Sequence, residues 1–256
     1  MEQINEKGQN MDLAEQFWYA WPWMGLGAAV VMMVLLFCTD LLRSDGGGRW
    51  LDPVWLAWLA VPVYLLHQFE EYACNLADGE YLIIGQVFAN AGDIMDLSQL
   101  PLAFFPEVNI LLVWVTVPIS AYLCGRNPVI GLAPYGFIFV NGLMHCVGSL
   151  TGLMPIALNP GFWTGTFVFL PLVALVVYAT FKRRFMSGGA LAVAFVAGAI
   201  SHVFFAMGYV VSAFVGGGAA LVVGGIGVFS SIFFAWLGCK VFHVRYVSSE
   251  DNAPND

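Results

Sequence analysis

The sequence VWLAWLAVPVYLLHQFEE, residues 54–71, contains the pattern on which the interpretation of the whole chain depends. Its first part, Val54–Leu66, carries no charge, and an imidazole and two carboxyl groups follow at its end. An ionisable side chain inside a membrane helix is costly, and such residues usually face the interior of a bundle and serve a function. On a helix, Glu70 and Glu71 follow His67 by three and four residues, so all three side chains lie on one side.

The composition of the chain indicates a membrane protein. Its 256 residues are 60% hydrophobic and 10% charged, and the mean hydropathy is +0.79. A soluble globular domain carries about 25% charged residues. The chain has 9 basic and 17 acidic residues, and its basic residues are not clustered enough to suggest nucleic acid as a partner. The lipid bilayer is the partner that the composition predicts.

The apolar runs predict an all-α polytopic membrane protein with about seven transmembrane helices, since each span needs about 20 residues. The expected spans are residues 23–42, 54–74, 108–124, 129–153, 161–181, 190–214 and 219–242. Three regions follow from this division: a polar amino-terminal segment at residues 1–21, a helical bundle at residues 22–245, and a disordered tail at residues 246–256. Within the bundle, residues 76–105 contain several acids and are expected to form an interfacial or re-entrant segment over its outer face.

The positive charges predict the orientation of these spans. With seven spans, every Lys and Arg except Lys7 falls on one side of the membrane. The positive-inside rule makes that side cytoplasmic, which places the amino terminus outside and the carboxyl terminus in the cytoplasm. The expected location is the plasma (inner) membrane of a bacterium. Small residues in the last two spans would let helices approach closely and would permit a homo-oligomer.

Three histidines are expected at nearly the same depth in the bundle. His67, His145 and His202 each lie about 22–26 Å from the inner boundary of a hydrocarbon core about 30 Å thick, if each span is a straight helix. Three different spans would therefore bring an imidazole toward the outer half of the membrane. If the spans also adjoin laterally, these side chains could form one site.

Such a site has the ligand types of a divalent metal centre. Histidines with a carboxylate bind zinc and leave one position open for water in catalytic sites. We predict His67, Glu71, His145 and His202 as ligands of a divalent metal, with zinc preferred and iron or manganese as alternatives. A glutamate that is not a ligand, Glu70 or Glu71, would act as general base or orient a ligand histidine. Asn141, one turn before His145, would complete the catalytic set by bonding a ligand or polarising a substrate carbonyl.

The same motifs resemble those of a known family. His67-x-x-Glu70-Glu71 matches the namesake motif of the HXXEE family of integral membrane proteins, and Asn141-Gly-Leu-Met-His145 resembles its looser Asn-x-x-x-His motif. The stretch PGFWT, residues 160–164, resembles one that often follows. The resemblance covers roughly residues 50–180 and implies a multi-helix membrane protein, without implying a particular activity.

The first functional hypothesis is a metal-dependent membrane hydrolase that acts on a lipid-like or membrane-embedded substrate. A di-iron oxidase or desaturase is the alternative within the enzymes, although such sites usually need about six His and carboxylate ligands. A proton- or ion-coupled transporter is the alternative from another class, because membrane carboxylates and histidines also carry protons and cations. A purely structural role, as a buried ion pair or an interhelical hydrogen bond, is the simplest alternative for each residue. Convergence of the predicted ligands in a structure would favour the metalloenzyme.

Overall fold

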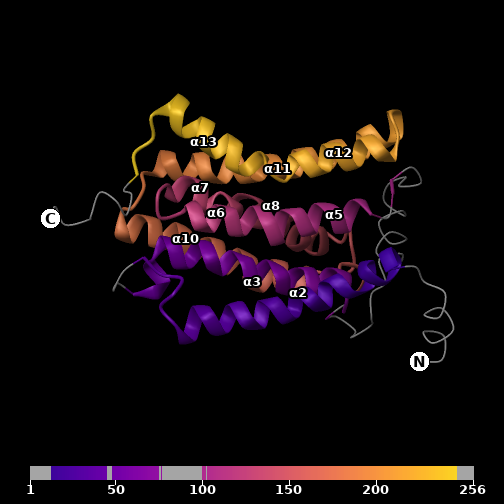
Figure 1. Cartoon of the computed structure of the whole chain (residues 1–256), viewed down its shortest axis with the longest axis horizontal. Helices are drawn as coiled ribbons and strands as arrows, with labels where there is room; N and C mark the ends of the chain where they lie inside the picture. Colours follow the sequence, from indigo (N-terminus) through magenta and orange to yellow (C-terminus); the bar gives the residue numbers. More distant parts are fainter. Residues whose placement is uncertain (1–12, 45–47, 75, 77–99, 102, 247–256) are drawn as a thin grey trace.

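The computed structural model describes residues 13–44, 48–74, 76, 100–101 and 103–246, and every regular element within them is a helix. Figure 1 shows the long helices lying side by side and roughly along one direction, as expected for a membrane bundle. The predicted all-α class is therefore confirmed for the described part of the chain. The predicted interfacial segment at residues 76–105 and the predicted tail at residues 246–256 lie almost wholly outside it.

The helices follow the apolar runs of the sequence. In chain order they are α2 (Leu13–Cys38), η1 (Arg49–Leu51), α3 (Pro53–Tyr72), α5 (Phe104–Ile110), η2 (Leu111–Thr116), α6 (Val117–Leu123), α7 (Pro128–Leu132), α8 (Pro134–Leu150), η3 (Ile156–Leu158), α9 (Phe162–Thr164), η4 (Gly165–Phe169), α10 (Leu170–Arg183), α11 (Gly188–Phe214), α12 (Gly217–Gly227) and α13 (Ser230–Phe242). Two of these, η2 and η4, are turns of π-helix inside longer helical segments. Such turns are frequent at functional sites.

Among the described residues, five helical segments are long and apolar enough to cross a membrane. The number is six if the bent pair α12 and α13 counts as one span. They are Gln16–Cys38, Phe104–Leu123, Pro128–Leu150, Phe162–Arg183 and Gly188–Phe214, with a bend of 46° between α12 and α13. The chain is thus a protein with several membrane-type helices. Helix α3 has 20 residues but is not among them, because the motif makes its last two turns polar.

The first helix starts earlier than the expected span at residues 23–42. It begins at Leu13 and ends at Cys38, so residues 13–21, which were expected before the first span, are helical. Trp21 in this part is fully buried, with its ring 5.3 Å from that of Tyr72 at the end of α3. No local pattern predicts this burial, because an aromatic ring suits both an interface and a core.

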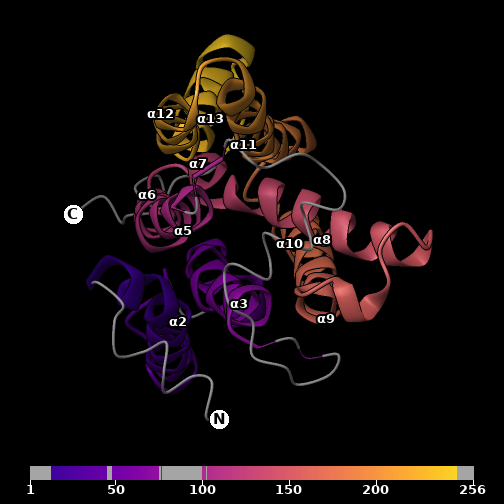
Figure 2. The same ribbon diagram turned by 90° about the vertical axis from the view of Figure 1, so that its right-hand side faces the viewer.

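Helix α3 lies at the centre of the part of the bundle that contains the motif. Figure 2 shows it with α2 on one side, α9 and α10 on another, and α5 and α6 on a third. Its start is fixed by Asp52, whose carboxylate accepts hydrogen bonds from the backbone N–H groups of Val54 and Trp55 at 2.9 and 3.4 Å. Pro53 follows at the first helical position, where its missing N–H costs nothing. The helix is therefore enclosed along its length, and its polar end faces other helices.

Helices α8 and α11 approach each other closely through glycines. A Cβ atom built on Gly136 of α8 would lie 2.9 Å from the Cα of Gly198 in α11. A Cβ atom built on Gly198 would in turn lie 2.9 Å from the Cα of Gly136. Small residues allow such close approach between membrane helices. The contact agrees with the prediction that small residues of the span at residues 190–214 let helices approach closely. It also fixes the position of α11 against α8.

Candidate metal centre

Three of the predicted ligands converge at the end of α3. His67 and Glu71 come from α3 and His145 from α8, and one potential ligand atom of each lies within 4.8 Å of the others. The distance from His67 Nε2 to Glu71 Oε2 is 3.6 Å, and the two imidazole centroids are 5.0 Å apart. Two ligands of a tetrahedral zinc lie about 3.4 Å apart, from bond lengths of about 2.1 Å. Small side-chain movements would therefore suffice to bring all three onto one ion.

The tautomer of His67 is fixed by Thr164. The Thr164 hydroxyl donates to Glu70 Oε2 at 2.5 Å, and His67 Nδ1 lies 2.8 Å from the same hydroxyl oxygen. Because the one hydroxyl proton goes to the carboxylate, the oxygen accepts from His67, whose Nδ1 therefore carries the proton. His67 Nε2 is buried and has no hydrogen-bond partner. Its lone pair faces Glu71, as a metal ligand requires.

The tautomer of His145 is fixed in the same way by Asn159. His145 Nδ1 lies 2.7 Å from Asn159 Oδ1, which can only accept a hydrogen bond. The amide of Asn159 is oriented by two bonds that it donates, to the His145 carbonyl at 2.9 Å and to Ser149 Oγ at 2.7 Å. His145 Nε2 is thus left without a proton. Hydrogen bonds of this kind orient the ligand histidines of metal sites and set their tautomer.

Glu70 is directed away from the other carboxylate. It is 1% exposed, and it accepts hydrogen bonds from the backbone N–H groups of Trp163 at 3.0 Å and Thr164 at 2.7 Å, besides the Thr164 hydroxyl. It therefore caps the amino end of the helical segment at residues 162–183 from outside that segment. Adjacent residues of a helix point about 100° apart, so Glu70 and Glu71 contact different neighbours. The structure does not place Glu70 where the predicted general base would act.

A polar network connects the end of α3 with α5. Gln68 Nε2 donates to the Asn109 carbonyl at 3.0 Å, and Asn109 Nδ2 donates to the Tyr72 hydroxyl at 3.1 Å. Gln68 and Tyr72 stand on either side of Glu71 along the helix. The network therefore fixes the part of α3 that carries Glu71 beside α5.

Gly161 packs against both imidazoles, a contact that no pattern in the sequence predicts. Its φ is +92°, and a Cβ atom built on it would lie 2.7 Å from His67 Cε1 and 2.8 Å from His145 Cε1. Only glycine combines this backbone conformation with such close approach at little cost. Gly161 therefore lets the turn before α9 close over the two rings.

Replacing Gly161 with alanine is expected to destabilise the protein by about 1–3 kcal/mol and to separate the two imidazoles. The matched control is Gly152→Ala, because Gly152 also has positive φ, +75°, but a methyl group added there would meet no atom within 4 Å. Thermal unfolding should reveal backbone strain in both variants. Metal titration should show weaker binding for Gly161→Ala only, and equal binding by the two variants would contradict the contact.

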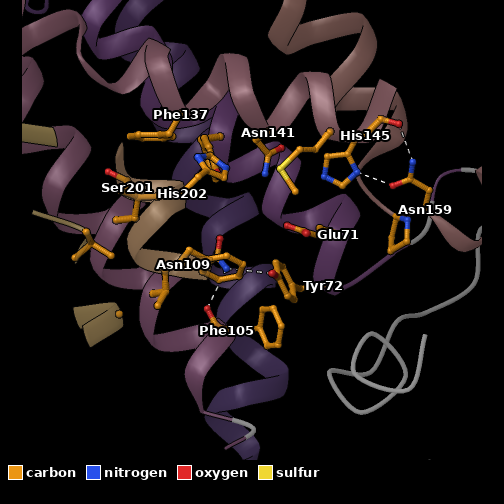
Figure 3. A pocket seen from close by; sticks show the side chains of 18 of the residues that line it. Glu71, Tyr72, Phe105, Asn109, Phe137, Asn141, His145, Asn159, Ser201 and His202 are labelled. Carbon is orange, nitrogen blue, oxygen red and sulfur yellow. Dashed lines mark hydrogen bonds between the residues drawn. The ribbon is translucent and has the colours of Figure 1, made fainter. Parts of the chain in front are cut away.

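A cavity of about 390 Å³ lies beside the three candidate ligands, and Glu71 and His145 are part of its wall. Figure 3 shows both side chains at this cavity, with Asn141 between His145 and His202. Most of the wall is apolar, from residues that include Phe105, Leu112, Phe137, Met144, Leu158 and Phe205. Apolar walls with a few convergent polar groups are typical of small-molecule sites.

His202 lines this cavity but is not part of the group of potential metal ligands. The sequence placed it at the depth of His67 and His145, and depth alone does not fix the lateral position of a side chain. Helix α11 packs against α8, on a different side of the cavity from α3. Asn141 also lines the cavity and lies outside the group of His67, Glu71 and His145. The structure therefore brings together three of the four predicted ligands and places His202 apart.

The fold and the site define a helical membrane protein with a largely buried centre of two histidines and one glutamate. Residues 58–176, somewhat less than half of the chain, match the model of the family described as "Protein of unknown function with HXXEE motif", so this part of the chain is similar to the proteins of that family. The match includes the three candidate ligands together with Asn159 and Thr164, whereas His202 lies outside it. No curated protein and no solved structure matched the chain.

Proposed function

We propose that this protein is a metal-dependent membrane hydrolase whose divalent metal, zinc in the first place, is held by His67, Glu71 and His145. The observation that carries the proposal is the state of the two imidazoles. Both have their Nδ1 engaged by an oxygen acceptor, through Thr164 and Asn159, and both leave an unprotonated Nε2 beside a largely buried carboxylate. A structural ion pair would require no such arrangement of two neutral rings with convergent lone pairs.

The ligand set supports hydrolysis in particular. His67, His145 and Glu71 would hold a zinc ion through three ligands, and the ion would supply a water molecule made nucleophilic near neutral pH. Glu71 lies 3.6 Å from His67 Nε2 through one carboxylate oxygen and would act as a ligand of the ion. The apolar cavity wall would hold an alkyl chain and exclude bulk water. A lipid-like or membrane-embedded substrate fits these surroundings.

The proposed topology has seven spans, with α3 as the second. In its favour, α3 is 20 residues long, as is the segment Phe104–Leu123 that qualifies as a span. The amino terminus would lie outside and the carboxyl terminus in the cytoplasm, in a bacterial plasma membrane, because the basic residues would then gather on the cytoplasmic side. The metal centre would lie toward the outer side of the membrane and would receive its substrate from there.

The alternatives receive less support from the described residues. A di-iron oxidase usually needs about six His and carboxylate ligands, and the one group of potential ligands found among the described residues contains three. Coupled transport would need ionisable groups on both sides of the site, and the sequence offers almost none on the cytoplasmic side of His67, His145 and His202 within their spans.

The proposal is tested by the metal content of the purified protein in detergent, measured by inductively coupled plasma mass spectrometry. The wild-type protein is expected to contain about one zinc, iron or manganese per chain, and the double variant His67→Ala, Glu71→Ala almost none. His243→Ala is the matched control, because His243 is an exposed residue just after α13 and should leave the metal content unchanged. Chelation should abolish hydrolysis of neutral lipid esters or amides. A folded wild-type protein that never binds metal would exclude the proposal.

A further inference from the structure

The cavity contains a second polar pair besides the candidate ligands. Asn141 of α8 and His202 of α11 both line it, and Asn141 lies between His145 and His202 (Figure 3). The function proposed above uses neither of them. Ser201, next to His202, is already paired, since its hydroxyl lies 3.2 Å from Ser230 Oγ. Asn141 and His202 are therefore the polar side chains at this part of the cavity that require explanation.

Each of the two has a buried atom without a hydrogen-bond partner, Asn141 Oδ1 and His202 Nδ1. A buried polar atom that remains unpaired costs about 1–3 kcal/mol. A carboxamide oxygen can only accept a hydrogen bond, and an imidazole nitrogen accepts one when the other nitrogen carries the proton. Both atoms would be satisfied by a ligand that brings N–H or O–H groups into the cavity.

The charge of the wall restricts the ligand further. No Lys or Arg is found among the described residues that line the cavity, whereas phosphate and carboxylate groups are usually recognised by these side chains. The volume of about 390 Å³ is near the lower end of the usual range for small-molecule sites, about 300–1,000 Å³. The cavity thus suits a neutral head group with one alkyl chain better than an anionic lipid with two.

We propose, on the basis of the hydrolase proposed above, that its substrates are neutral single-chain lipids whose amide N–H or hydroxyl group donates hydrogen bonds to Asn141 and His202. These two residues would then determine specificity, while His67, Glu71 and His145 hold the metal. A simple alkyl ester of similar size fills the same space but offers no donor. A site built to hydrogen-bond such a group discriminates strongly against an analogue that lacks it.

The test compares the binding of dodecanamide, whose NH₂ group offers one N–H donor to each of the two acceptors, and methyl dodecanoate, which has the same acyl chain and no donor. Titration calorimetry uses the full-length protein in lipid nanodiscs, with the heat of empty nanodiscs subtracted, and is repeated after chelation so that no hydrolysis interferes. The wild-type protein is expected to bind the amide at least about tenfold more tightly than the ester, from the energy of about one buried hydrogen bond. Asn141→Leu and His202→Phe should each reduce this ratio, and the double variant should bring it close to one.

Met144→Leu is the matched control, because Met144 lines the same cavity without a polar group. It should change both affinities alike and keep their ratio. Equal binding of the two lipids by the wild-type protein, no binding of either, or an unchanged ratio in a folded double variant would overturn the inference. These outcomes are independent of the metal content. A preference for the amide in a protein without metal would support the subsite and reject the hydrolase.

Discussion

Replacing Glu70 with alanine is expected to lower the free energy of unfolding by about 3–5 kcal/mol, as is typical when one partner of a buried charged interaction is removed. The carboxylate accepts from two backbone N–H groups and one hydroxyl at residues 163 and 164. Alanine would leave both N–H groups without a partner and the hydroxyl with His67 alone. Backbone groups in a membrane interior cannot turn to water instead. The segment from α9 to α10 would lose its attachment to α3, and thermal unfolding in mild detergent should show a lower Tm.

The adjacent glutamate provides the control for this prediction. With the metal removed from both proteins by chelation, Glu71→Ala should unfold at nearly the wild-type temperature, because Glu71 faces the two imidazoles and not the helix terminus. When metal is supplied, this variant should fail to bind it. Glu70→Gln should have an intermediate effect, since its amide has one accepting oxygen and an NH₂ group that cannot accept a backbone N–H. If Glu70→Ala and Glu71→Ala shift Tm equally, the division of roles between the two carboxylates is wrong.

Replacing Thr164 with valine is expected to weaken metal binding about 10–100-fold, the usual effect of removing a residue that orients a ligand histidine. Valine has nearly the same shape as threonine but lacks the hydroxyl that accepts from His67 Nδ1 and donates to Glu70. Without it, the imidazole is free to change its tautomer and to turn its unprotonated nitrogen away from Glu71. Competition with a chelating indicator dye measures the change in affinity.

Two further variants make the Thr164 result specific. Thr164→Ser keeps the hydroxyl and is expected to retain most of the wild-type affinity. Thr151→Val removes a hydroxyl that bonds only within its own helix end, to the Val147 carbonyl at 2.7 Å, and should leave metal binding unchanged. Wild-type affinity in Thr164→Val would show that His67 needs no partner at Nδ1.

The sequence predicted the helical class, the long membrane-type helices and three residues of the candidate site. His67 and Glu71 lie together because a spacing of four residues defines a single helix face without any tertiary information. His145, which was expected at the same depth in a separate span, lies beside them. That these three residues hold a metal stays a prediction. The order and approximate bounds of the apolar helices followed directly from runs of hydrophobic residues.

Other features depend on contacts that no local pattern contains. The difference between Glu70 and Glu71 arises from the helix that each one meets, and residues 163–164 are far away in the sequence. Asn159 and Thr164 lie in a turn whose approach to the imidazoles depends on the positive φ of Gly161. His202 shares the depth of the site but belongs to a helix on another side of the cavity. Lateral position in a bundle was the information missing from each prediction.

Helix α3 is both the most polar of the long helices that enclose the site and one of the most deeply buried. The cellular insertion machinery examines a helix before its final neighbours are present, and acidic residues there oppose entry into lipid. We therefore expect α3 to enter the membrane inefficiently when it is synthesised alone, and to do so well when α2 precedes it. The two glutamates of α3 would then also determine the order in which the helices of this protein enter the membrane.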